Sequence, residues 1–236
     1  MSDGDAEPLS SGATLASAVC ERLRADIIAC RIAPGARLRI REVCQRYDVS
    51  LSPMREALNR LSAEQLVVLN DQRGFAVSDV SRNCLEELTR TRVWLNELAL
   101  RQAIQCGTTV WEEDVLLAYH RLSRVSRYTG PDGRTLNPAW DQPHRAFHSA
   151  LIAACPSHWV RGYCEQLFDQ SDRYRNLSRL IIMRKRGDID EHRAIMEAAV
   201  ARNAERAVLT LTQHVTQTTD ILLRHWDEFA DAALEP

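Results

Sequence analysis

Four of the seven histidines occupy positions that could serve one chemical purpose. His144 and His148 are four residues apart, so on a helix both side chains project from the same face, one turn apart. His192 and His214 follow on two later segments of helical character. Imidazole nitrogens are ligands that zinc, nickel and other borderline divalent metals accept. By spacing alone, the pattern fits either a metal site or an incidental pair of histidines on an arginine-rich helix.

A hydrolytic metal centre would need more than metal ligands. In H-E-x-x-H proteases the glutamate beside the first histidine is the general base, whereas here His144 is followed by Arg145, which cannot accept a proton. A catalytic site also keeps an open position beside three protein ligands, and four histidines fill more of the shell. The chain has no G-x-S-x-G, Walker or Rossmann motif. We therefore expect no enzymatic activity, and a metal-dependent hydrolase fused to a helix-turn-helix is the weaker alternative.

The second group of candidate residues is N-terminal and rich in arginine. Residues 13–80 contain ten arginines against eight acidic residues, whereas the whole chain carries a net charge of −2 at pH 7. This uneven charge has the sign expected if the N-terminal part contacts phosphate and the rest does not. Taken singly, each of these arginines could equally belong to a solvated helix face, paired with Glu42, Glu56 or Glu64.

The elements that would position these arginines follow a recognisable order. A stripe of Leu15, Val19, Leu23 and Ile27 predicts a helix that Pro34-Gly35 ends. The pattern then predicts a short helix at 40–46, a turn, a helix at 51–61, and a hairpin of strands at 66–69 and 75–77. This is the order of a winged helix-turn-helix, in which the start of the second helix of the pair faces base edges in the major groove.

In that arrangement the start of the second helix offers Ser50, Ser52 and Arg55, and its backbone N–H groups could meet a phosphate. Arg55 could contact guanine with paired donors or hold a phosphate. The tip of the wing is Arg73-Gly74, where glycine permits a sharp turn and arginine could extend into the minor groove. A DNA-packing protein is the other class of DNA binder, but it leaves the acidic, histidine-bearing remainder unexplained.

Beyond residue 82 the sequence predicts helices alone. We expect them at about 83–105, 110–128, 139–154, 158–182, 188–202 and 204–229. The fold class is therefore mainly α: a winged helix-turn-helix of three helices and a hairpin, followed by an all-α bundle of about six helices. The expected domains are a disordered tail at 1–12, a DNA-binding domain at 13–80 and a helical domain at 82–230.

Composition places the chain among ordinary globular proteins, with 45% apolar and 26% charged residues. Its seven cysteines are an odd number without a C-x-x-C pair, which is typical of a reducing compartment. The first dozen residues lack the basic and apolar regions of a signal peptide, and no window of 18 consecutive residues is apolar. We expect a cytoplasmic protein with no membrane partner.

The stretch IAPGARLRIREVCQRYDVSLSPMREALNRLSAEQLVVLNDQRGFAV, residues 32–77, resembles the GntR family of bacterial repressors. The resemblance implies a homodimer that binds a short palindromic operator in double-stranded DNA. Carried onto this sequence, the family's DNA contacts fall at Arg41, Ser50, Ser52, Arg55, Arg73 and Gly74. Position 51, often a basic residue in the family, is Leu51 here, so the operator sequence of relatives cannot be transferred.

The segments HRAFHSALIAAC, YCEQLFDQSDRYRNLS and DEHRAIMEAAVARNAERAVLTLTQH resemble the FCD ligand-binding domain of the FadR branch of that family. Such domains often hold a metal ion that anchors a small carboxylate effector. The resemblance implies a metal site of His144, His148, His192 and His214, with zinc expected and nickel as the alternative. His144 stands where the family often has an aspartate, which leaves the site more positive.

A carboxylate at that metal would need further polar partners. Arg92 and Asn96, four residues apart on the first helix of this domain, are candidates, as is Arg175. Their structural alternative is pairing with nearby carboxylates or a place on a dimer surface. The resemblance implies a transcription regulator, usually a repressor, in which the effector changes operator affinity through the link at residues 80–85.

Overall fold

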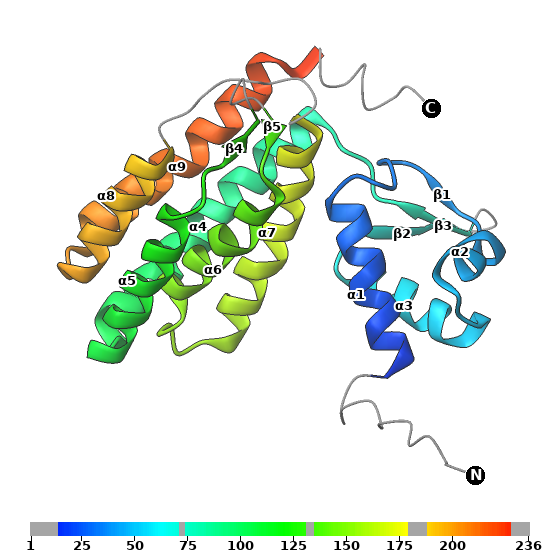
Figure 1. Ribbon diagram of the computed structural model, residues 1–236, viewed down its shortest axis with the longest axis horizontal. Coiled ribbons are helices and arrows are strands. Elements are labelled where there is room, and N and C mark those ends of the chain that lie inside the picture. Colours follow the sequence, from blue (N-terminus) through cyan, green and yellow to red (C-terminus); the bar gives the residue numbers. More distant parts are fainter. Residues whose placement is uncertain (1–13, 71–73, 131–134, 179–187, 228–236) are drawn as a thin grey trace, which may run out of the picture. The chain divides into compact units, whose positions relative to one another are not determined.

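The computed structural model of the protein describes residues 14–70, 74–130, 135–178 and 188–227 (Figure 1). The chain divides into two compact units, Met1–Asp79 and Val80–Pro236. The first unit holds three helices and a small sheet, and the second is dominated by helices. The mainly α fold predicted from the sequence is confirmed. No helix in the described ranges is long and apolar enough to cross a membrane.

Helix α1 (Leu15–Ile28) opens the first unit. Thr14 caps it, because its hydroxyl oxygen accepts a hydrogen bond from the backbone of the first turn at 3.2 Å. The buried face of α1 contains Val19, Leu23 and Ile27 of the predicted stripe, and it packs against helix α3 (Leu51–Ala63). Leu15, the first residue of that stripe, is 59% exposed. The hydrophobic periodicity of the sequence therefore fixes which face of α1 meets α3.

Helices α2 (Ile40–Tyr47) and α3 form the helix-turn-helix pair. Asp48 ends α2 in the left-handed conformation, with φ of 53°, which aspartate tolerates better than most residues. Ser50 then occupies the N-cap position of α3. Three residues thus suffice to connect the two helices and present the start of α3.

A three-stranded antiparallel sheet completes the unit. Its order is β1-β3-β2, where β1 is Arg37–Leu38, β2 is Val67–Asn70 and β3 is Gly74–Val77. The predicted hairpin corresponds to β2 and β3, which pair from Val67↔Val77 to Asn70↔Gly74. Strand β1 was not predicted, since two residues are too few to show an alternating pattern.

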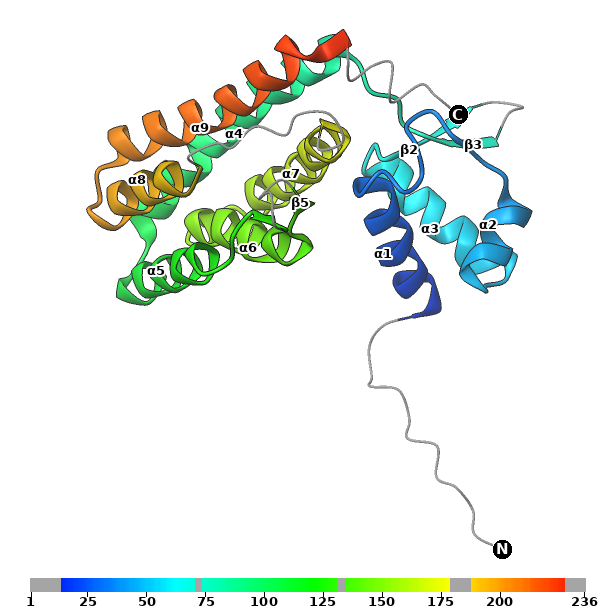
Figure 2. The ribbon, with the colours of Figure 1, turned by 45° about the horizontal axis from the view of Figure 1, so that its top comes forward.

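The second unit is a bundle in which helices distant in sequence lie side by side (Figures 1 and 2). Helix α9 packs on α4 and α8, α4 also packs on α7, and α5 packs on α6 and α8. The helices are α4 (Arg82–Cys106), α5 (Thr109–Ser123), α6 (Asp141–Ile152), α7 (His158–Ser178), α8 (Asp188–Val200) and α9 (Ala204–Arg224), with a short 3-10 helix η1 (Pro138–Trp140) before α6.

The prediction of helix alone beyond residue 82 was wrong between α5 and α6. The expected helix at 110–128 ends at Ser123, and strands β4 (Tyr128–Thr129) and β5 (Thr135–Leu136) pair as a short hairpin. Asn137 anchors its base, because its side-chain amide donates to the Ser126 carbonyl at 2.9 Å. The polar stretch after α5 therefore folds locally instead of extending the helix.

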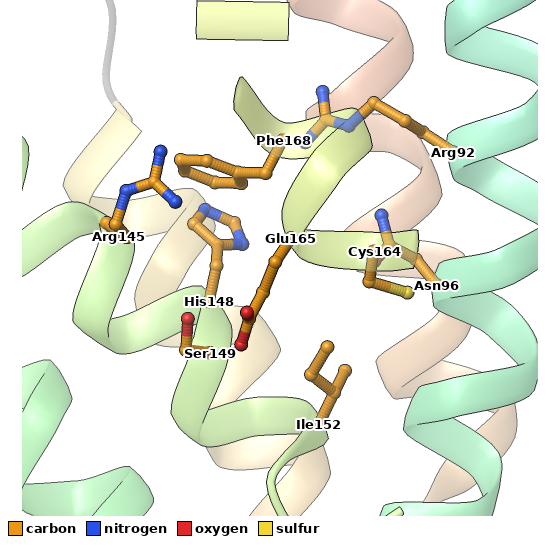
Figure 3. Close-up of a pocket in the computed structure, with 9 residues that line it drawn as sticks. All are labelled: Arg92, Asn96, Arg145, His148, Ser149, Ile152, Cys164, Glu165 and Phe168. Atoms are coloured by element: carbon orange, nitrogen blue, oxygen red, sulfur yellow. The ribbon is translucent and has the colours of Figure 1, made fainter. Parts of the chain in front are cut away.

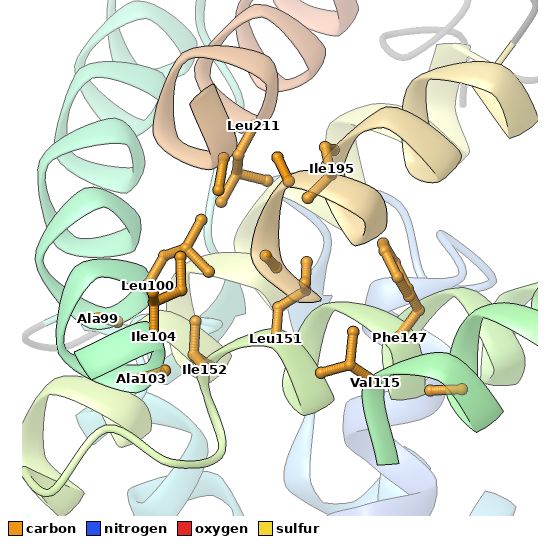
Figure 4. Packing of buried hydrophobic residues seen from close by; sticks show 14 of the residues in the cluster. Ala99, Leu100, Ala103, Ile104, Val115, Phe147, Leu151, Ile152, Ile195 and Leu211 are labelled. Carbon is orange, nitrogen blue, oxygen red and sulfur yellow. The ribbon is translucent and has the colours of Figure 1, made fainter. Parts of the chain in front are cut away.

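Aliphatic and aromatic side chains from five of the helices fill the centre of the second unit (Figure 4). Leu100 of α4, Val115 of α5, Phe147 of α6, Ile195 of α8 and Leu211 of α9 are all at most 4% exposed. Phe147 lies between the two histidines of α6 in sequence. The same core therefore fixes the helix from which the candidate metal ligands project.

Candidate metal centre and nucleic-acid interface

The four histidines singled out by their spacing lie together in the second unit. His144 and His148 come from α6, His192 from α8 and His214 from α9. Their candidate ligand nitrogens all lie within 4.8 Å of one another. His144, His192 and His214 are buried, and His148 is partly buried. Three helices separated by long stretches of sequence thus converge on one point.

The distances within this cluster suit a single divalent ion. Nitrogens bound at 2.0–2.1 Å from one ion lie about 3.0–3.4 Å apart when adjacent and no more than about 4.2 Å apart when opposite. The Nε2 atoms of His144 and His148 are 3.1 Å apart, which matches adjacent ligands. In a tetrahedral zinc site every pair of nitrogens lies about 3.3 Å apart, so a separation of 4.8 Å requires a movement of roughly 0.7 Å per ring.

The electrostatic environment keeps these rings in the form that binds metals. Burial, together with the positive charge of Arg175 and the other rings, holds the pKa of His144 well below 6.5. Burial and the neighbouring His192 and His214 lower the pKa of His148 in the same way. Both rings are therefore neutral at pH 7, and neutral imidazole is the ligand form.

Two residues that the sequence analysis missed orient the histidines. The Nδ1–H of His214 donates to the Glu191 carboxylate at 2.7 Å, which directs the other ring nitrogen toward the cluster. Trp140 stacks on the His144 ring, with ring centroids 4.1 Å apart. Glu191 directly precedes His192 in the sequence, and that adjacency was a signal available beforehand.

Arg175 contacts the cluster from α7. Its Nη1 lies 3.1 Å from Nδ1 of His144, and its Nη2 lies 2.7 Å from the Asp172 carboxylate. Arg175 was predicted as an effector ligand, and the structure places it against a candidate metal ligand instead of in the adjoining pocket. Asp172 is buried, which raises its pKa despite the neighbouring guanidinium groups.

A pocket adjoins the cluster and includes His148 in its wall (Figure 3). Arg92 and Asn96, the other two predicted effector ligands, both line it. The Arg92 Nη1 donates to the Ser171 hydroxyl at 2.6 Å, while its buried Nε has no hydrogen-bond partner among the described residues. The full lining is Arg92, Asn96, Arg145, His148, Ser149, Ile152, Cys164, Glu165 and Phe168.

Three guanidinium groups lie around the Phe168 ring. Those of Arg145, Arg92 and Arg175 lie 4.8, 5.6 and 5.7 Å from the ring centroid. Figure 3 shows Phe168 between Arg145 and Arg92 at the pocket. Sequence reasoning considered Arg145 only as a residue that could not act as a base, and it did not consider Phe168. Their convergence depends on the packing of α4, α6 and α7.

The predicted DNA contacts of the first unit lie at the start of α3. Ser50, Ser52 and Arg55 are all exposed. The hydroxyl of Ser50 makes no capping hydrogen bond, although the residue occupies the N-cap position. Leu51 beside them is 50% exposed, an unusual environment for an apolar side chain at the end of a helix. The arrangement presents a helix N-terminus with polar side chains directed outward.

Arg41 and Arg55 differ from neighbouring arginines in their pairing. Within the described part of the chain neither forms an ion pair, whereas Arg60 of α3 pairs with Glu56. Both predicted contacts are thus exposed cations without a carboxylate partner there. At the wing, Gly74 has φ of +76° and open space where a Cβ would stand. Arg73, the other predicted wing residue, lies outside the described residues.

Comparisons with known proteins match both units. The family described as bacterial regulatory proteins, gntR family, matches residues 15–77, and the FCD domain matches residues 87–217. Together these matches span the helix-turn-helix, its wing and nearly all of the helical bundle. They cover the candidate DNA-contacting residues and all four histidines.

Two curated relatives align over most of their own length. The regulator BphR of Paraburkholderia xenovorans, described as an uncharacterized HTH-type transcriptional regulator, is 38% identical over 222 residues, covering 94% of this chain and 91% of the relative. The HTH-type transcriptional repressor GlaR of Escherichia coli is 32% identical over 204 residues, covering 85% and 92%. The solved structure of E. coli McbR/YncC has the same fold, with a TM-score of 0.76, 21% identity, and coverage of 91% of this chain and 100% of that one.

The relatives are transcription regulators and not enzymes, in keeping with the absence of a general base beside His144. A helix-turn-helix with its wing precedes an FCD bundle in this chain, as in FadR-type regulators. The chain therefore belongs to the GntR family of DNA-binding transcriptional regulators.

Proposed function

We propose that the chain is a cytoplasmic homodimeric repressor that binds a palindromic operator, and that a small organic acid bound at a metal-containing site changes its affinity for DNA. Two relatives support the sign of regulation, because GlaR and RspR of Escherichia coli are both described as transcriptional repressors. The remaining parts of the proposal rest on the chemistry of the two sites.

The metal proposed for the histidine cluster is zinc, with nickel as the alternative. The ligands would be His144, His148, His192 and His214, whose nitrogens are close enough for one ion after small ring movements. Four neutral imidazoles suit a borderline divalent metal better than calcium or magnesium, which prefer oxygen ligands. When bound, the ion would supply a Lewis-acidic positive charge to which a carboxylate can attach.

The single observation that carries the effector proposal is the gathering of three guanidinium groups beside the pocket. Arg92, Arg145 and Arg175 surround the same ring. The carboxylates near them are Asp169, Asp172 and, in the pocket wall, Glu165, so these charges balance as long as no ion is bound. A divalent ion held by neutral histidines would add two further positive charges. Because uncompensated charge is costly in a partly buried site, an anionic ligand is the species that this site would select.

Within this proposal the pocket residues have distinct roles. Arg92 would bind the effector carboxylate through its guanidinium group, and Asn96 would supply an amide from the same helix, one turn later. Arg175 would contact the anion from the side of His144. Arginine suits these positions because its planar group can hold both oxygens of a carboxylate.

For DNA, we propose that α3 enters the major groove, with Ser50, Ser52 and Arg55 facing the bases and backbone and Arg41 holding a phosphate. The wing formed by β2 and β3 would place Arg73 and Gly74 at the adjacent minor groove. Two such helices in a dimer would contact half-sites about one DNA turn apart.

Regulation would pass through α7 to the start of α4. The Tyr174 hydroxyl lies 3.4 Å from both the backbone nitrogen and the carbonyl oxygen of Ser81, the residue that caps α4. Asp172 and Arg175 flank Tyr174 on the same helix. An effector that binds two arrangements of this contact with different affinity would shift the link at residues 80–85.

The DNA part is tested by fluorescence anisotropy with fragments of the region upstream of the gene. We expect sequence-specific, salt-sensitive binding, and a loss of about 1–3 kcal/mol of binding free energy in Arg55→Ala. Arg101→Ala is the matched control, because Arg101 is an arginine of the second unit engaged by Glu97 and Glu205. Absence of specific binding to every fragment would refute the proposal.

The metal part is tested by elemental analysis of the purified chain. We expect about one equivalent of zinc or nickel in the wild type and a large loss in the His148→Ala, His192→Ala double variant. His120→Ala is the control, because His120 is an exposed histidine on α5 outside the cluster. Equal metal content in the wild type and the double variant would remove the site.

A further inference from the structure

Each of the two ring nitrogens of His144 contacts a nitrogen atom of another side chain. On one side, its Nδ1 lies 3.1 Å from Nη1 of Arg175. On the other side, its Nε2 lies 3.1 Å from Nε2 of His148. The ring is 3% exposed and stacked on Trp140, so rotation cannot relieve either contact cheaply.

The contact with Arg175 determines where the imidazole carries its proton. A guanidinium group has five N–H donors and no acceptor, so Arg175 can only donate. Nδ1 of His144 must then accept, and the single proton of the neutral ring is on Nε2. In this tautomer the Nε2–H donates to His148, and His144 has no lone pair to offer a metal ion at that nitrogen.

Binding of a metal at Nε2 reverses these roles. The lone pair of Nε2 would be used by the ion, so the proton must lie on Nδ1, where it would face the N–H groups of Arg175 across 3.1 Å. Two donors at that separation repel each other, and the ion and the guanidinium repel as well. Arg175 must therefore release His144 before His144 can serve as a ligand.

We propose that Arg175 and the metal ion compete for His144, so that metal binding releases the Arg175 guanidinium for an anionic ligand. The inference rests on the proposed metal site and adds an order of events to it: metal first, anion second. The same N–H group of Arg175 serves in both states. It donates to His144 while no metal is bound, and it becomes available to a carboxylate once the metal has bound the His144 ring.

Arg175 can make this exchange without leaving the site. Its Nη2 is bound to Asp172 at 2.7 Å, and its guanidinium lies 5.5 Å from the Trp140 ring and 5.7 Å from the Phe168 ring. These contacts do not involve Nδ1 of His144, so they persist when that one hydrogen bond breaks. The released group stays beside the cluster.

An aspartate at position 144 would abolish the competition. A carboxylate has two oxygens, so one can bind the ion while the other accepts from Arg175. Neutral histidine has a single lone pair on its ring nitrogens and cannot do both. The variant His144→Asp therefore separates competition at the ring from any general effect of the Arg175 charge.

The test uses the full-length chain stripped of metal, with Co²⁺ as a probe whose visible absorption reports binding. We expect Arg175→Met to bind Co²⁺ about tenfold more tightly than the wild type, the equivalent of one charge-assisted hydrogen bond. The double variant Asp172→Asn, Arg175→Met should show the same rise. Because it removes both charges of the pair, the rise there cannot come from an uncovered carboxylate.

The anion is tested with acetate on the same proteins. We expect acetate to bind the Co²⁺-loaded wild type at least about tenfold more tightly than the metal-free wild type, and to bind loaded Arg175→Met about tenfold more weakly than the loaded wild type. In the His144→Asp background, Arg175→Met should no longer strengthen Co²⁺ binding. Arg193→Met is the control for charge alone, because Arg193 is exposed on α8 and its hydrogen-bond partner is Tyr119.

The outcomes separate this inference from the proposed function. A wild type that binds Co²⁺ with an affinity that neither Arg175 variant increases overturns the competition alone. A wild type that binds no Co²⁺ overturns the metal site and the competition together. An increase that also appears in Arg193→Met overturns the competition as well, since it would reflect net charge and not the contact with His144.

Discussion

Buried neutral histidines make the stability of the metal-free protein depend on pH. The pKa values of His144 and His148 lie well below the ordinary 6.5, mainly because both rings are buried. Groups with a depressed pKa in the folded state take up protons more readily when unfolded, so they stabilise the fold fully above 6.5 and lose that contribution as pH falls. We expect metal-free protein to lose about 1 kcal/mol per histidine between pH 7.5 and 5.5. Urea unfolding at both pH values measures the loss.

The control for this pH dependence replaces the titrating rings. In His144→Gln, His148→Gln the loss of stability over the same pH interval should shrink by about 2 kcal/mol. The comparison uses the change with pH within each protein, so a general destabilisation of the variant does not affect it. An equal pH dependence in the two proteins would show that these rings do not titrate as described.

Glu191 provides a prediction about how the cluster holds its metal. Its carboxylate accepts the hydrogen bond from Nδ1–H of His214 and so fixes the ring nitrogen available to an ion. Loss of such an orienting carboxylate typically weakens metal binding by about 10–100-fold. We expect Glu191→Gln to weaken zinc binding toward the lower end of that range, since glutamine keeps an oxygen acceptor. Competition with a chromophoric chelator measures the affinity.

A neighbouring residue supplies the matched control for Glu191. Asp190→Asn removes an exposed carboxylate from the same turn of α8, one that pairs with Arg193 and not with a histidine. Zinc affinity should be unchanged in this variant. If both substitutions weaken binding equally, the effect is one of net charge, and the hydrogen bond to His214 is unimportant.

At the residue scale, the sequence predicted the four histidines that the structure brings together but not what surrounds them. The His144–His148 pair follows from helical spacing, and His192 and His214 were candidates from their places on two later helical segments. The resemblance to the FCD domain then strengthened the set of four. The positions of Phe168 and Arg175 depend on how α7 packs against α4 and α6. No local pattern in the sequence encodes that packing, and therefore the contact between Arg175 and His144 could not be predicted.

The close packing between the end of helix α4 and the start of helix α5 requires a glycine at position 107. Gly107 ends α4, and a Cβ built there would lie 2.6 Å from Cδ2 of the Trp111 ring and 2.7 Å from the Ala103 carbonyl oxygen. Trp111 cannot easily move, because its Nε1–H donates to the Ala150 carbonyl at 2.9 Å. We expect Gly107→Ala to lower the free energy of unfolding by about 1–3 kcal/mol. Chemical denaturation gives this value.

Gly162 is the matched control within α7. A Cβ there would meet nothing within 4 Å. Gly162→Ala should therefore raise the free energy of unfolding by about 0.5–1 kcal/mol, the usual gain of alanine over glycine in a helix. Two glycine-to-alanine changes with opposite signs would establish that the close approach to Trp111 is responsible. A stabilised Gly107→Ala would contradict it.

At the element scale, long periodic helices were predictable and two-residue strands were not. The stripe in α1 repeats over four turns, so its existence and buried face could be read directly. Strands β1 and β4 contain two residues each and have no period to detect. The pairing of β1 is set by partners far along the chain, Ala76 and Phe75.

At the scale of the whole molecule, the homodimer that we propose needs a surface for the second copy. Trp94 and Leu98 on α4 are 62% and 47% exposed, and Trp159 and Tyr163 on α7 are 66% and 51% exposed. Each pair is spaced by four residues, and α4 packs on α7. Large exposed aromatic side chains of this kind are the residues that dominate protein interfaces once covered.

We expect Trp94→Glu, Trp159→Glu to convert the full-length chain from dimer to monomer in sedimentation equilibrium. Placing two charges in an apolar interface removes favourable contacts and adds the cost of burying the charges. Operator affinity should fall by about 100-fold or more, because a monomer engages each half-site separately and loses the effective concentration that the second helix-turn-helix gains from the first.

Leu209→Glu tests whether the effect belongs to this surface. Leu209 lies on α9 of the same unit and is 57% exposed, so the change introduces the same charge at a comparable apolar position. It should leave both the dimer and operator affinity intact. A monomeric Leu209→Glu beside a dimeric Trp94→Glu, Trp159→Glu would move the interface to α9.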